Sequence, residues 1–258
     1  MTEHVTRRSL AADLRAIGLA PGDAVLVHAA LRSIGPIVGG TDMVVAALGD
    51  AVGPDGTVLG YTDWEFDEDW TGADVPPFDP ARSRSIRDNG WFPEMLRTTP
   101  GALRSNSPGA SMAALGGRAA WFVADHALDY GYGPQSPLGR LVEARGKVLM
   151  LGAPLHTMTL LHHAEHLADI PGKRIKRYET PIVVDGRTVW RRFEEFETSE
   201  PVVAGLDEYF FDTIVDDFLA TGGGHRGSVG AAPSVLVEAR PIVDFAVDWL
   251  ERRFTPAS

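Results

Sequence analysis

Residues 160–174, LLHHAEHLADIPGKR, contain three of the eight histidines of the chain together with a glutamate. His162 and Glu165 are three residues apart, so on a helix they share one face with Cβ atoms about 5–6 Å apart. A carboxylate at that distance can accept a hydrogen bond from the imidazole, which selects its tautomer and raises the basicity of its other nitrogen. The spacing therefore predicts that His162 is a general base oriented by Glu165.

Two other interpretations of this segment stay open. His162 and His166 are four residues apart, as in two-histidine zinc sites on a helix, but the glutamate does not stand where the H-E-x-x-H pattern has it. The chain also has no cysteine that could complete such a site, and we expect no metal. The segment could instead be a solvated surface helix without a chemical role, and we assign His163 and His166 to that background.

The composition limits the classes of protein that the chain can belong to. Its 258 residues are 44% hydrophobic, which is enough to fill a sizeable core. Apolar runs stay below the about 18 residues of a membrane span, and the charged segment MTEHVTRRSL does not resemble a signal peptide, so we expect a cytoplasmic protein. The net charge of -11 disfavours nucleic-acid and membrane partners and suits a cationic ligand. The absence of cysteine excludes disulfides and a cysteine acyl-enzyme.

The order of the predicted elements indicates an α/β protein. Buried strands are predicted at residues 23–29, 56–64 and 146–153, and helices at 6–17, 42–52, 91–99, 118–128 and from 160 onward. The unit of strand, glycine-bearing loop, helix and strand is typical of a parallel sheet that binds ligands at the carboxyl ends of its strands.

The last third of the chain has a different pattern. An Asp-Gly turn between β-rich runs predicts a hairpin at residues 180–197, and predicted helices at 206–221 and 239–254 flank a glycine-rich segment. We therefore expect a central mixed, largely parallel sheet flanked by helices, with a C-terminal β-hairpin and helical subregion. This fold would form a single domain over residues 1–258, in which the part from about residue 178 could be a subdomain.

Two acidic segments suggest the kind of ligand. Residues 61–70, YTDWEFDEDW, set carboxylates among aromatic rings directly after a predicted strand, and residues 193–200, FEEFETSE, add four more carboxylates. Carboxylates pair with ammonium groups, and aromatic faces bind sugars and cations. The two segments suit a polyamine or an aminosugar, although each could also be only a solvated acidic loop.

Seven blocks of the chain, in order, resemble the aminoglycoside 3-N-acetyltransferase family. They are VHAALRSIGPIVGG, GTVLGYTDW, PFDP, RSNSPGASMAALG, YGPQSPLGRL, GKVLMLGAPLHTMTLLHHAEHLADIPGKR and GSVGAAPSVLVEARPIVDFAVDWL, and the resemblance extends from about residue 6 to residue 254. It implies the antibiotic N-acetyltransferase fold, which is unrelated to that of the common N-acetyltransferases. It also implies acetyl transfer from acetyl-CoA, as co-substrate, to the 3-amino group of the 2-deoxystreptamine ring of an aminoglycoside, which confers antibiotic resistance.

The family block T-x-L-H-x-A-E carries the catalytic roles onto His162 and Glu165 and adds Thr159. An alkylammonium group cannot attack a thioester, so His162 must bind the free amine or remove its proton, while Glu165 stabilises the imidazolium. Without a cysteine or a G-x-S-x-G elbow, we expect direct attack in a ternary complex. The Thr159 hydroxyl and backbone amides at the start of the helix are candidate donors to the oxyanion.

Two segments are candidates for binding the coenzyme. The loop HAALRSIG offers backbone amides, a hydroxyl and a guanidinium at the mouth of the sheet, and the resemblance supports it. The predicted contacts in this loop are His28, Ala29, Ala30, Leu31, Arg32, Ser33, Ile34 and Gly35. The segment RSNSPGAS adds Arg104, Ser105 and Ser111, although Ser107 stands where related sequences have a histidine.

For the polycationic aminoglycoside, the predicted contacts are Asp63, Trp64, Glu65, Asp67, Asp79 and Glu197. Many relatives carry the block D-S-N-G-I-L-D where this chain reads ETSEPVV, with Glu197 in place of the first aspartate, so the range of accepted antibiotics stays open. An acyltransferase of the same fold acting on another amine and an inactive aminoglycoside-binding protein remain as alternatives. The oligomeric state is open as well, with a homodimer among the options.

Overall fold

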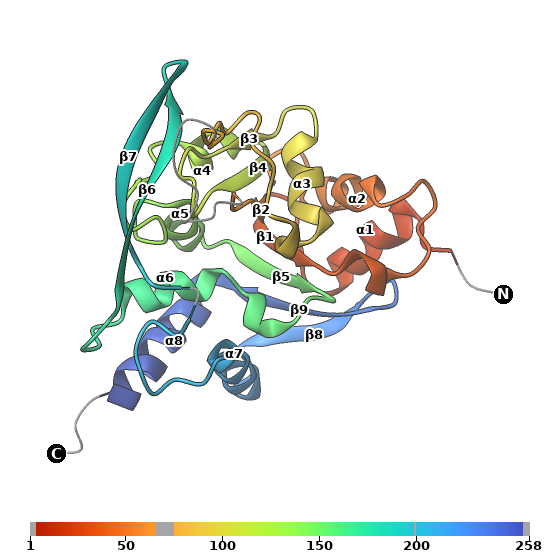
Figure 1. Cartoon of the computed structure of the whole chain (residues 1–258). Coiled ribbons are helices and arrows are strands. Elements are labelled where there is room, and N and C mark those ends of the chain that lie inside the picture. The colour runs from red at the N-terminus through yellow and green to blue at the C-terminus, as the bar shows by residue number, and fades with distance from the viewer. Residues whose placement is uncertain (1–3, 65–74, 199, 255–258) are drawn as a thin grey trace.

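The computed structural model describes residues 4–64, 75–198 and 200–254 (Figure 1). Seven strands form its main sheet, and they are β1 (Ala24–Ala29), β2 (Thr57–Tyr61), β3 (Leu103–Arg104), β4 (Met112–Gly116), β5 (Lys147–Leu151), β8 (Gly224–Val229) and β9 (Ala232–Glu238). Their order in the sheet is β3-β4-β2-β1-β5-β9-β8. β1 therefore lies at the centre, and its run AVLV is fully buried, as expected for a strand covered on both faces.

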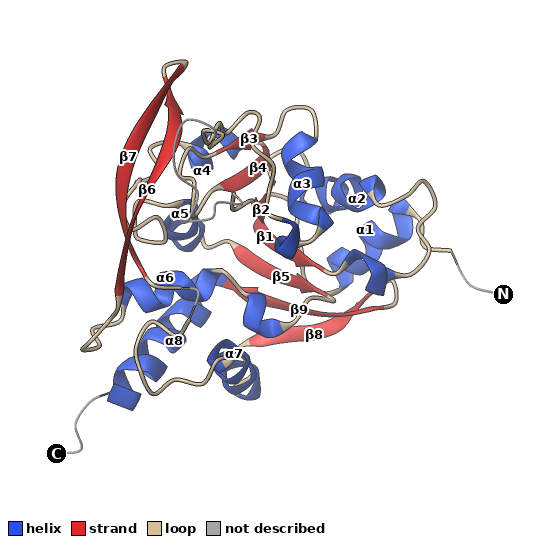
Figure 2. Cartoon of the chain, viewed as in Figure 1, coloured by secondary structure: helices blue, strands red, loops and turns tan. Residues whose placement is uncertain are grey.

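Helices cover both faces of this sheet (Figure 2). They are α1 (Arg7–Ala16), α2 (Asp42–Val52), α3 (Trp91–Thr98), α4 (Ala119–Val123), α5 (Pro137–Glu143), α6 (Leu160–Leu167), α7 (Phe210–Ala220) and α8 (Ala239–Phe254), with short 3-10 turns η1 (Leu31–Ile34), η2 (Arg87–Asn89) and η3 (Leu155–Thr157). No described helix combines the length and the apolar composition that crossing a membrane would need.

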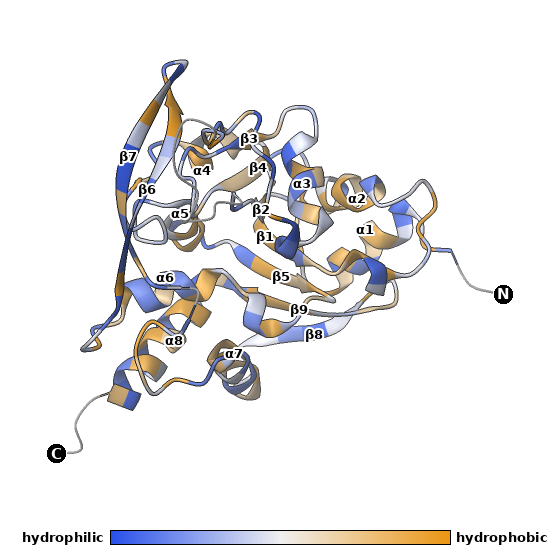
Figure 3. Ribbon diagram, viewed as in Figure 1, coloured by the Kyte–Doolittle hydropathy of each residue, from blue (hydrophilic) through white to orange (hydrophobic). Residues whose placement is uncertain are grey.

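Alternation along the strands separates two hydrophobic cores. Leu26 of β1 packs in the core beneath α4 to α8, whereas its neighbours Val25 and Val27 pack in the core beneath α1, α2 and α3. Hydrophobic colour follows the inner strands β5 and β9, and the edge strand β8 is paler (Figure 3). A polar edge strand discourages pairing with another chain.

The mixed sheet is confirmed, but its parallel part is smaller than the sequence predicts. β1 pairs in parallel with β2 and β5 only, and β3, β4, β8 and β9 all pair antiparallel. One reason is the glycine-rich segment 222–234, in which the sequence indicates no strand. It forms most of the hairpin of β8 and β9, whose two-residue turn can join only antiparallel neighbours.

The predicted C-terminal hairpin is confirmed and is longer than expected. β6 (Ile175–Val184) and β7 (Arg187–Phe196) form a separate two-stranded sheet (Figure 2). Asp185 and Gly186 between them both have positive φ, 49° and 73°, as the favoured two-residue hairpin turn requires. A small core of Trp64, Phe78, Ile182 and Phe193 packs the hairpin against the loops that follow β2.

A close contact joins the end of β5 to the turn η1. Gly152 has a φ of 65°, and a Cβ atom there would lie 1.9 Å from the hydroxyl oxygen of Ser33. This hydroxyl donates to the carbonyl oxygen of Ala30, 2.7 Å away, at the end of β1. Gly152 therefore lets the chain leave β5 in direct contact with the loop after β1.

We expect Gly152→Ala to destabilise the protein more than Gly172→Ala. Both glycines have left-handed backbones, which cost a non-glycine residue about 1–2 kcal/mol. Only at Gly152 would the added methyl group also displace Ser33, whereas nothing lies within 4 Å of the Cβ position at Gly172. Overpacking of this kind costs about 1–3 kcal/mol more. Urea unfolding of the two variants measures the difference, and equal losses would contradict the close contact.

Candidate active site

The predicted pair of His162 and Glu165 is in contact. α6 follows β5 through the turn η3, so its first turn lies at the carboxyl end of a central strand. Nδ1 of His162 lies 2.6 Å from a carboxylate oxygen of Glu165. The Glu165 side chain is 3% exposed and that of His162 is 21% exposed. With Nδ1 donating to this carboxylate, Nε2 holds the lone pair and remains available to a ligand.

Aromatic rings hold the imidazole of His162 from two sides. The centroid of its ring lies 5.0 Å from that of Tyr132 and 5.0 Å from that of Phe211. Tyr132 is fixed in turn, because its hydroxyl lies 2.6 Å from that of Tyr61 and donates to the carbonyl oxygen of Gly109 at 3.0 Å. This packing restricts the ring to one orientation while leaving one edge accessible.

His162 faces a first cavity of about 290 Å³, which we call the acidic cavity. The described carboxylates that line it are Asp63, Glu195 and Glu197. Aromatic side chains form much of the remaining wall, namely those of Tyr61, Trp64, Tyr132, Tyr178 and Phe196. Carboxylates among aromatic faces form a site for a cation that also carries apolar or sugar surface.

Two carboxyl groups of the acidic cavity are partly withdrawn from water. Burial raises the pKa of Asp63 to about 7, although the backbone N–H of Trp64 donates to it at 2.8 Å. Burial also raises the pKa of Glu195 to about 7, against backbone N–H donors at Phe196 and Gly131. In both cases the loss of hydration outweighs the hydrogen bonds that favour the charged form. The cavity therefore carries less negative charge at neutral pH than its residues suggest.

A second cavity of about 400 Å³, the strand-end cavity, lies on another side of His162. Its walls include the end of β1, the turn η2 and the segment that leads from β5 into α6. Thr159 lines it and makes no side-chain capping bond to α6, so its hydroxyl is not engaged in that role. Tyr61 and His162 line both this cavity and the acidic cavity, which meet at these two side chains.

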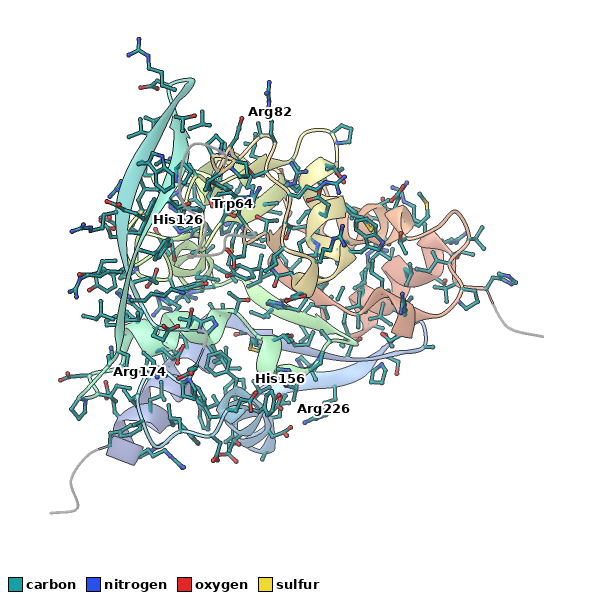
Figure 4. The ribbon with its side chains drawn as sticks, in the orientation of Figure 1. Trp64, Arg82, His126, His156, Arg174 and Arg226 are labelled. Atoms are coloured by element: carbon teal, nitrogen blue, oxygen red, sulfur yellow. The ribbon has the colours of Figure 1, made fainter. Side chains whose placement is uncertain are left out.

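A third cavity of about 230 Å³ adjoins the pair of His162 and Glu165. His162 and Glu165 line it together with Glu200 and Glu208, which add carboxylates on this side. His156 lines both this cavity and the strand-end cavity and lies beside α7 (Figure 4), where its Nδ1 is 3.2 Å from Asp212. The three cavities thus meet at the imidazole of His162.

The loop predicted to bind the coenzyme contributes its first residues to the strand-end cavity. His28, Ala29 and Ala30 line it. The other predicted contacts of this loop are placed differently, with Leu31 and Ile34 in the hydrophobic core, Arg32 exposed to solvent, Ser33 bonded to Ala30 and Gly35 in a left-handed turn.

The side chains of the second predicted coenzyme segment, RSNSPGAS, form hydrogen bonds within the protein. Arg104 donates to the carbonyl oxygens of Ser83 and Thr62 and to the hydroxyl of Ser111. The hydroxyl of Ser105 lies 2.9 Å from Nδ1 of His126 and accepts from the backbone of Met112. Arg104, Ser105 and Ser111 do not line the strand-end cavity. Their polar atoms are paired within the protein, and contact of these residues with the coenzyme stays a prediction.

The predicted aminoglycoside contacts divide into three groups. Asp63, Trp64 and Glu197 line the acidic cavity. Asp79 instead accepts from the backbone N–H of Ala81 at 2.9 Å, and its ion-pair partner Arg82 points away from the molecule (Figure 4). The predicted contacts Glu65 and Asp67 lie outside the described residues.

Sequence reasoning included Glu195, which lines the acidic cavity, only as one of four carboxylates of an acidic segment, and it assigned no role to Tyr132. Glu195 could have been found, because strand side chains alternate and residues 193, 195 and 197 share a face. Phe193 on that face is buried in the small hairpin core, so the neighbouring carboxylates point the same way. Tyr132 has no such local signal, because the segment between α4 and α5 that carries it reaches the site only through the tertiary fold.

The neighbouring histidines take no part in the pair, but they are not solvated as expected. His163 is buried, and its Nδ1 lies 2.7 Å from the carbonyl oxygen of Tyr132. His166 packs between the rings of Tyr130 and Phe196. Among the described residues, no three or more histidine, aspartate and glutamate side chains group closely enough to hold a metal ion.

The sequence matches the family described as aminoglycoside 3-N-acetyltransferase over residues 26–251. Aminoglycoside N(3)-acetyltransferase III of Pseudomonas aeruginosa is 45% identical over 260 residues, which cover 96% of this chain and 94% of that protein. Aminoglycoside N(3)-acetyltransferase VII of Streptomyces paromomycinus is 47% identical over 268 residues, covering 96% and 92%.

Solved structures agree with these sequence matches. The structure of AAC-IIIb in a binary complex with CoASH superimposes with a TM-score of 0.95 and 60% identity, covering 99% of this chain and 100% of that one. AAC-VIa bound to sisomicin superimposes with a TM-score of 0.92 and 36% identity, covering 98% and 100%. By sequence and by structure, the chain belongs to the aminoglycoside 3-N-acetyltransferase family.

Proposed function

We propose that the protein transfers an acetyl group from acetyl-CoA to the 3-amino group of the 2-deoxystreptamine ring of aminoglycoside antibiotics and thereby confers resistance. The observation that carries this proposal is the position of His162, which lies where the acidic and strand-end cavities meet and is held by Glu165. The names of the relatives support the reaction, and the complexes of AAC-IIIb with CoASH and of AAC-VIa with sisomicin support the two ligands.

The aminoglycoside occupies the acidic cavity in this proposal. Asp63, Glu195 and Glu197 offer carboxylates to its ammonium groups, and the rings of Trp64 and Tyr178 offer flat faces to its sugar rings. The third cavity, with Glu200 and Glu208, extends the acidic surface beyond the catalytic pair. Substituents on either side of the reacting ring can therefore meet carboxylates.

The coenzyme arm occupies the strand-end cavity. His28, Ala29 and Ala30 at the end of β1 and Thr159 before α6 line this cavity together with His162. A thioester bound there would place its acetyl group beside His162, because that side chain closes the cavity toward the aminoglycoside. Holding both reactants at one imidazole turns a reaction between two free molecules into one within a complex.

The reaction proceeds by direct attack within this ternary complex. Nε2 of His162 takes the proton of the attacking amine, and the carboxylate of Glu165 at Nδ1 stabilises the imidazolium that forms. The amine nitrogen bonds to the thioester carbon, and the oxyanion accepts hydrogen bonds, for which the Thr159 hydroxyl is a candidate. Collapse then expels the coenzyme thiolate, which is protonated to the free thiol.

A thiol-release assay tests the reaction and its range together. We expect free thiol to appear when acetyl-CoA is mixed with the protein and with gentamicin, tobramycin, neomycin or apramycin. Release with simple polyamines but with none of these drugs would indicate an acyltransferase of another amine. Calorimetric binding of the drugs without any thiol release would indicate an inactive binding protein.

We expect His162→Ala to lower kcat by at least about two orders of magnitude, the usual worth of general-base catalysis. The loss should shrink at high pH, where more of the substrate amine is already deprotonated. His225→Ala provides the matched control, since His225 is exposed on β8 and lines a cavity with Lys147 at the amino end of β5. Near-normal turnover of the His162 variant would refute the assignment.

Aminoglycoside binding should release protons near pH 7. Asp63 and Glu195 have pKa values of about 7 in the empty cavity, so each carries about half a proton there. A bound ammonium group favours the carboxylate and lowers both pKa values, so the complex holds fewer protons than the free protein. As far as these two carboxyl groups determine it, affinity should therefore rise as the pH increases from 6 to 8, and proton uptake by the ligand's own amines is common to the wild type and to a variant that lacks both carboxyls.

Calorimetry in two buffers with different ionisation enthalpies measures this release. The double variant Asp63→Asn with Glu195→Gln should lose most of it, because neither amide can ionise. Equal proton release by the wild type and the double variant would assign the protons to other groups.

A further inference from the structure

One histidine of the strand-end cavity has a buried nitrogen without a partner. Nε2 of His28, on β1, makes no hydrogen bond within the part of the chain that the structure describes. The side-chain nitrogen of Asn89, on the turn η2, is likewise buried and unpaired, and both residues line the same cavity. Leaving a buried polar group unpaired costs about 1–3 kcal/mol. Two such groups on one cavity wall indicate a ligand that supplies their partners.

Two other buried histidines, His126 and His163, show what a purely structural role looks like. Both ring nitrogens of His126 are bonded, to Ser105 at 2.9 Å and to the carbonyl oxygen of Gly131 at 2.7 Å. His163 bonds to the carbonyl oxygen of Tyr132. His28 differs from both, since its buried nitrogen lacks a protein partner and its side chain lines a cavity that it shares with His162.

His28 and His162, two of the three histidines that line this cavity, can take different parts in the chemistry. Burial, with a smaller contribution from the charge of His162, lowers the pKa of His28 to about 4. At neutral pH the ring of His28 is therefore uncharged and carries a single N–H. The charge that His162 carries as an imidazolium during the reaction is one of the two causes of this low pKa. One histidine can move the proton, while the other stays a neutral hydrogen-bond donor.

We propose that His28 donates its Nε2–H to the carbonyl oxygen of the thioester in the strand-end cavity and stabilises the oxyanion formed there. This inference rests on the proposed function. As the amine nitrogen bonds to the carbonyl carbon, the π electrons of the C=O bond move to the oxygen, which His28 holds. The C=O bond then re-forms and the C–S bond breaks. The amine proton passes to Nε2 of His162 and from there to the departing thiolate, so the products are the amide and the free thiol.

Kinetics of three variants test this role. His28→Leu removes the donor at similar volume, His28→Gln places an amide N–H near the position of Nε2, and His28→Asn places one near Nδ1. Loss of one oxyanion donor lowers kcat about 10²–10³-fold. We expect that loss for the leucine variant with little change in KM for acetyl-CoA, and a larger recovery with glutamine than with asparagine. His225→Leu on the exposed edge strand is the matched control.

A rise in KM with unchanged kcat would overturn the proposal, because it would show that His28 only binds the coenzyme. Equal activity of the glutamine and asparagine variants would also overturn it, since the position of the donor would then not matter. Thermal unfolding of each variant separates these results from loss of the fold, and the glutamine–asparagine comparison holds even where the leucine variant does not fold.

Infrared spectroscopy supplies a signal that a structural role would not give. With acetyl-CoA carrying ¹³C at the acetyl carbonyl, we expect the C=O stretch of the bound thioester to lie lower in the wild type than in His28→Leu, because a donor weakens that bond. Identical frequencies in the two proteins would refute the hydrogen bond. This measurement needs no aminoglycoside, so it tests His28 even if the wild type releases no thiol, an outcome that would refute the proposed function instead.

Discussion

The hydrogen bond between His162 and the buried carboxylate of Glu165 is the contact on which the site depends. A carboxylate that is 3% exposed has lost its water, and an unpaired charge in that position would be costly. Both residues belong to α6, so the helix itself sets their separation and the tertiary fold only has to aim the ring. The rings of Tyr132 and Phe211 do this from outside the helix.

Parallel pairing at the centre of the sheet explains why the cavities meet at this ring. β1, β2 and β5 are neighbours with a common direction, so their carboxyl ends lie together. His28 lies one residue before the end of β1, β2 ends with Tyr61, and β5 leads through a turn to His162. The outer antiparallel strands widen the sheet, and the hairpin of β6 and β7 brings Glu195 and Glu197 to the acidic cavity.

The site residues that the sequence predicts correctly as neighbours are those whose positions depend on local spacing along the chain. His162 and Glu165 are three residues apart on one helix, and Asp63 follows a strand directly, so neither prediction needs tertiary contacts. Tyr132 reaches the site through packing of distant segments, which a single sequence does not encode in any local pattern, whereas alternation along a strand could have indicated Glu195. Arg104 also shows the limit of local reasoning: the sequence assigns it to the coenzyme, and its guanidinium donates to carbonyl groups of the protein.

Loss of hydration raises the pKa of an acid and lowers the pKa of a base, so the neutral form of each is favoured. Burial raises the pKa values of Asp63 and Glu195 and lowers that of His28, and each shift favours the neutral form. The empty site therefore avoids part of the cost of buried charge. A polycationic ligand restores the charge of the carboxyls by displacing their protons, whereas an uncharged sugar of the same shape cannot. Selection for cations thus follows from the dielectric of the cavity as well as from the number of its carboxylates.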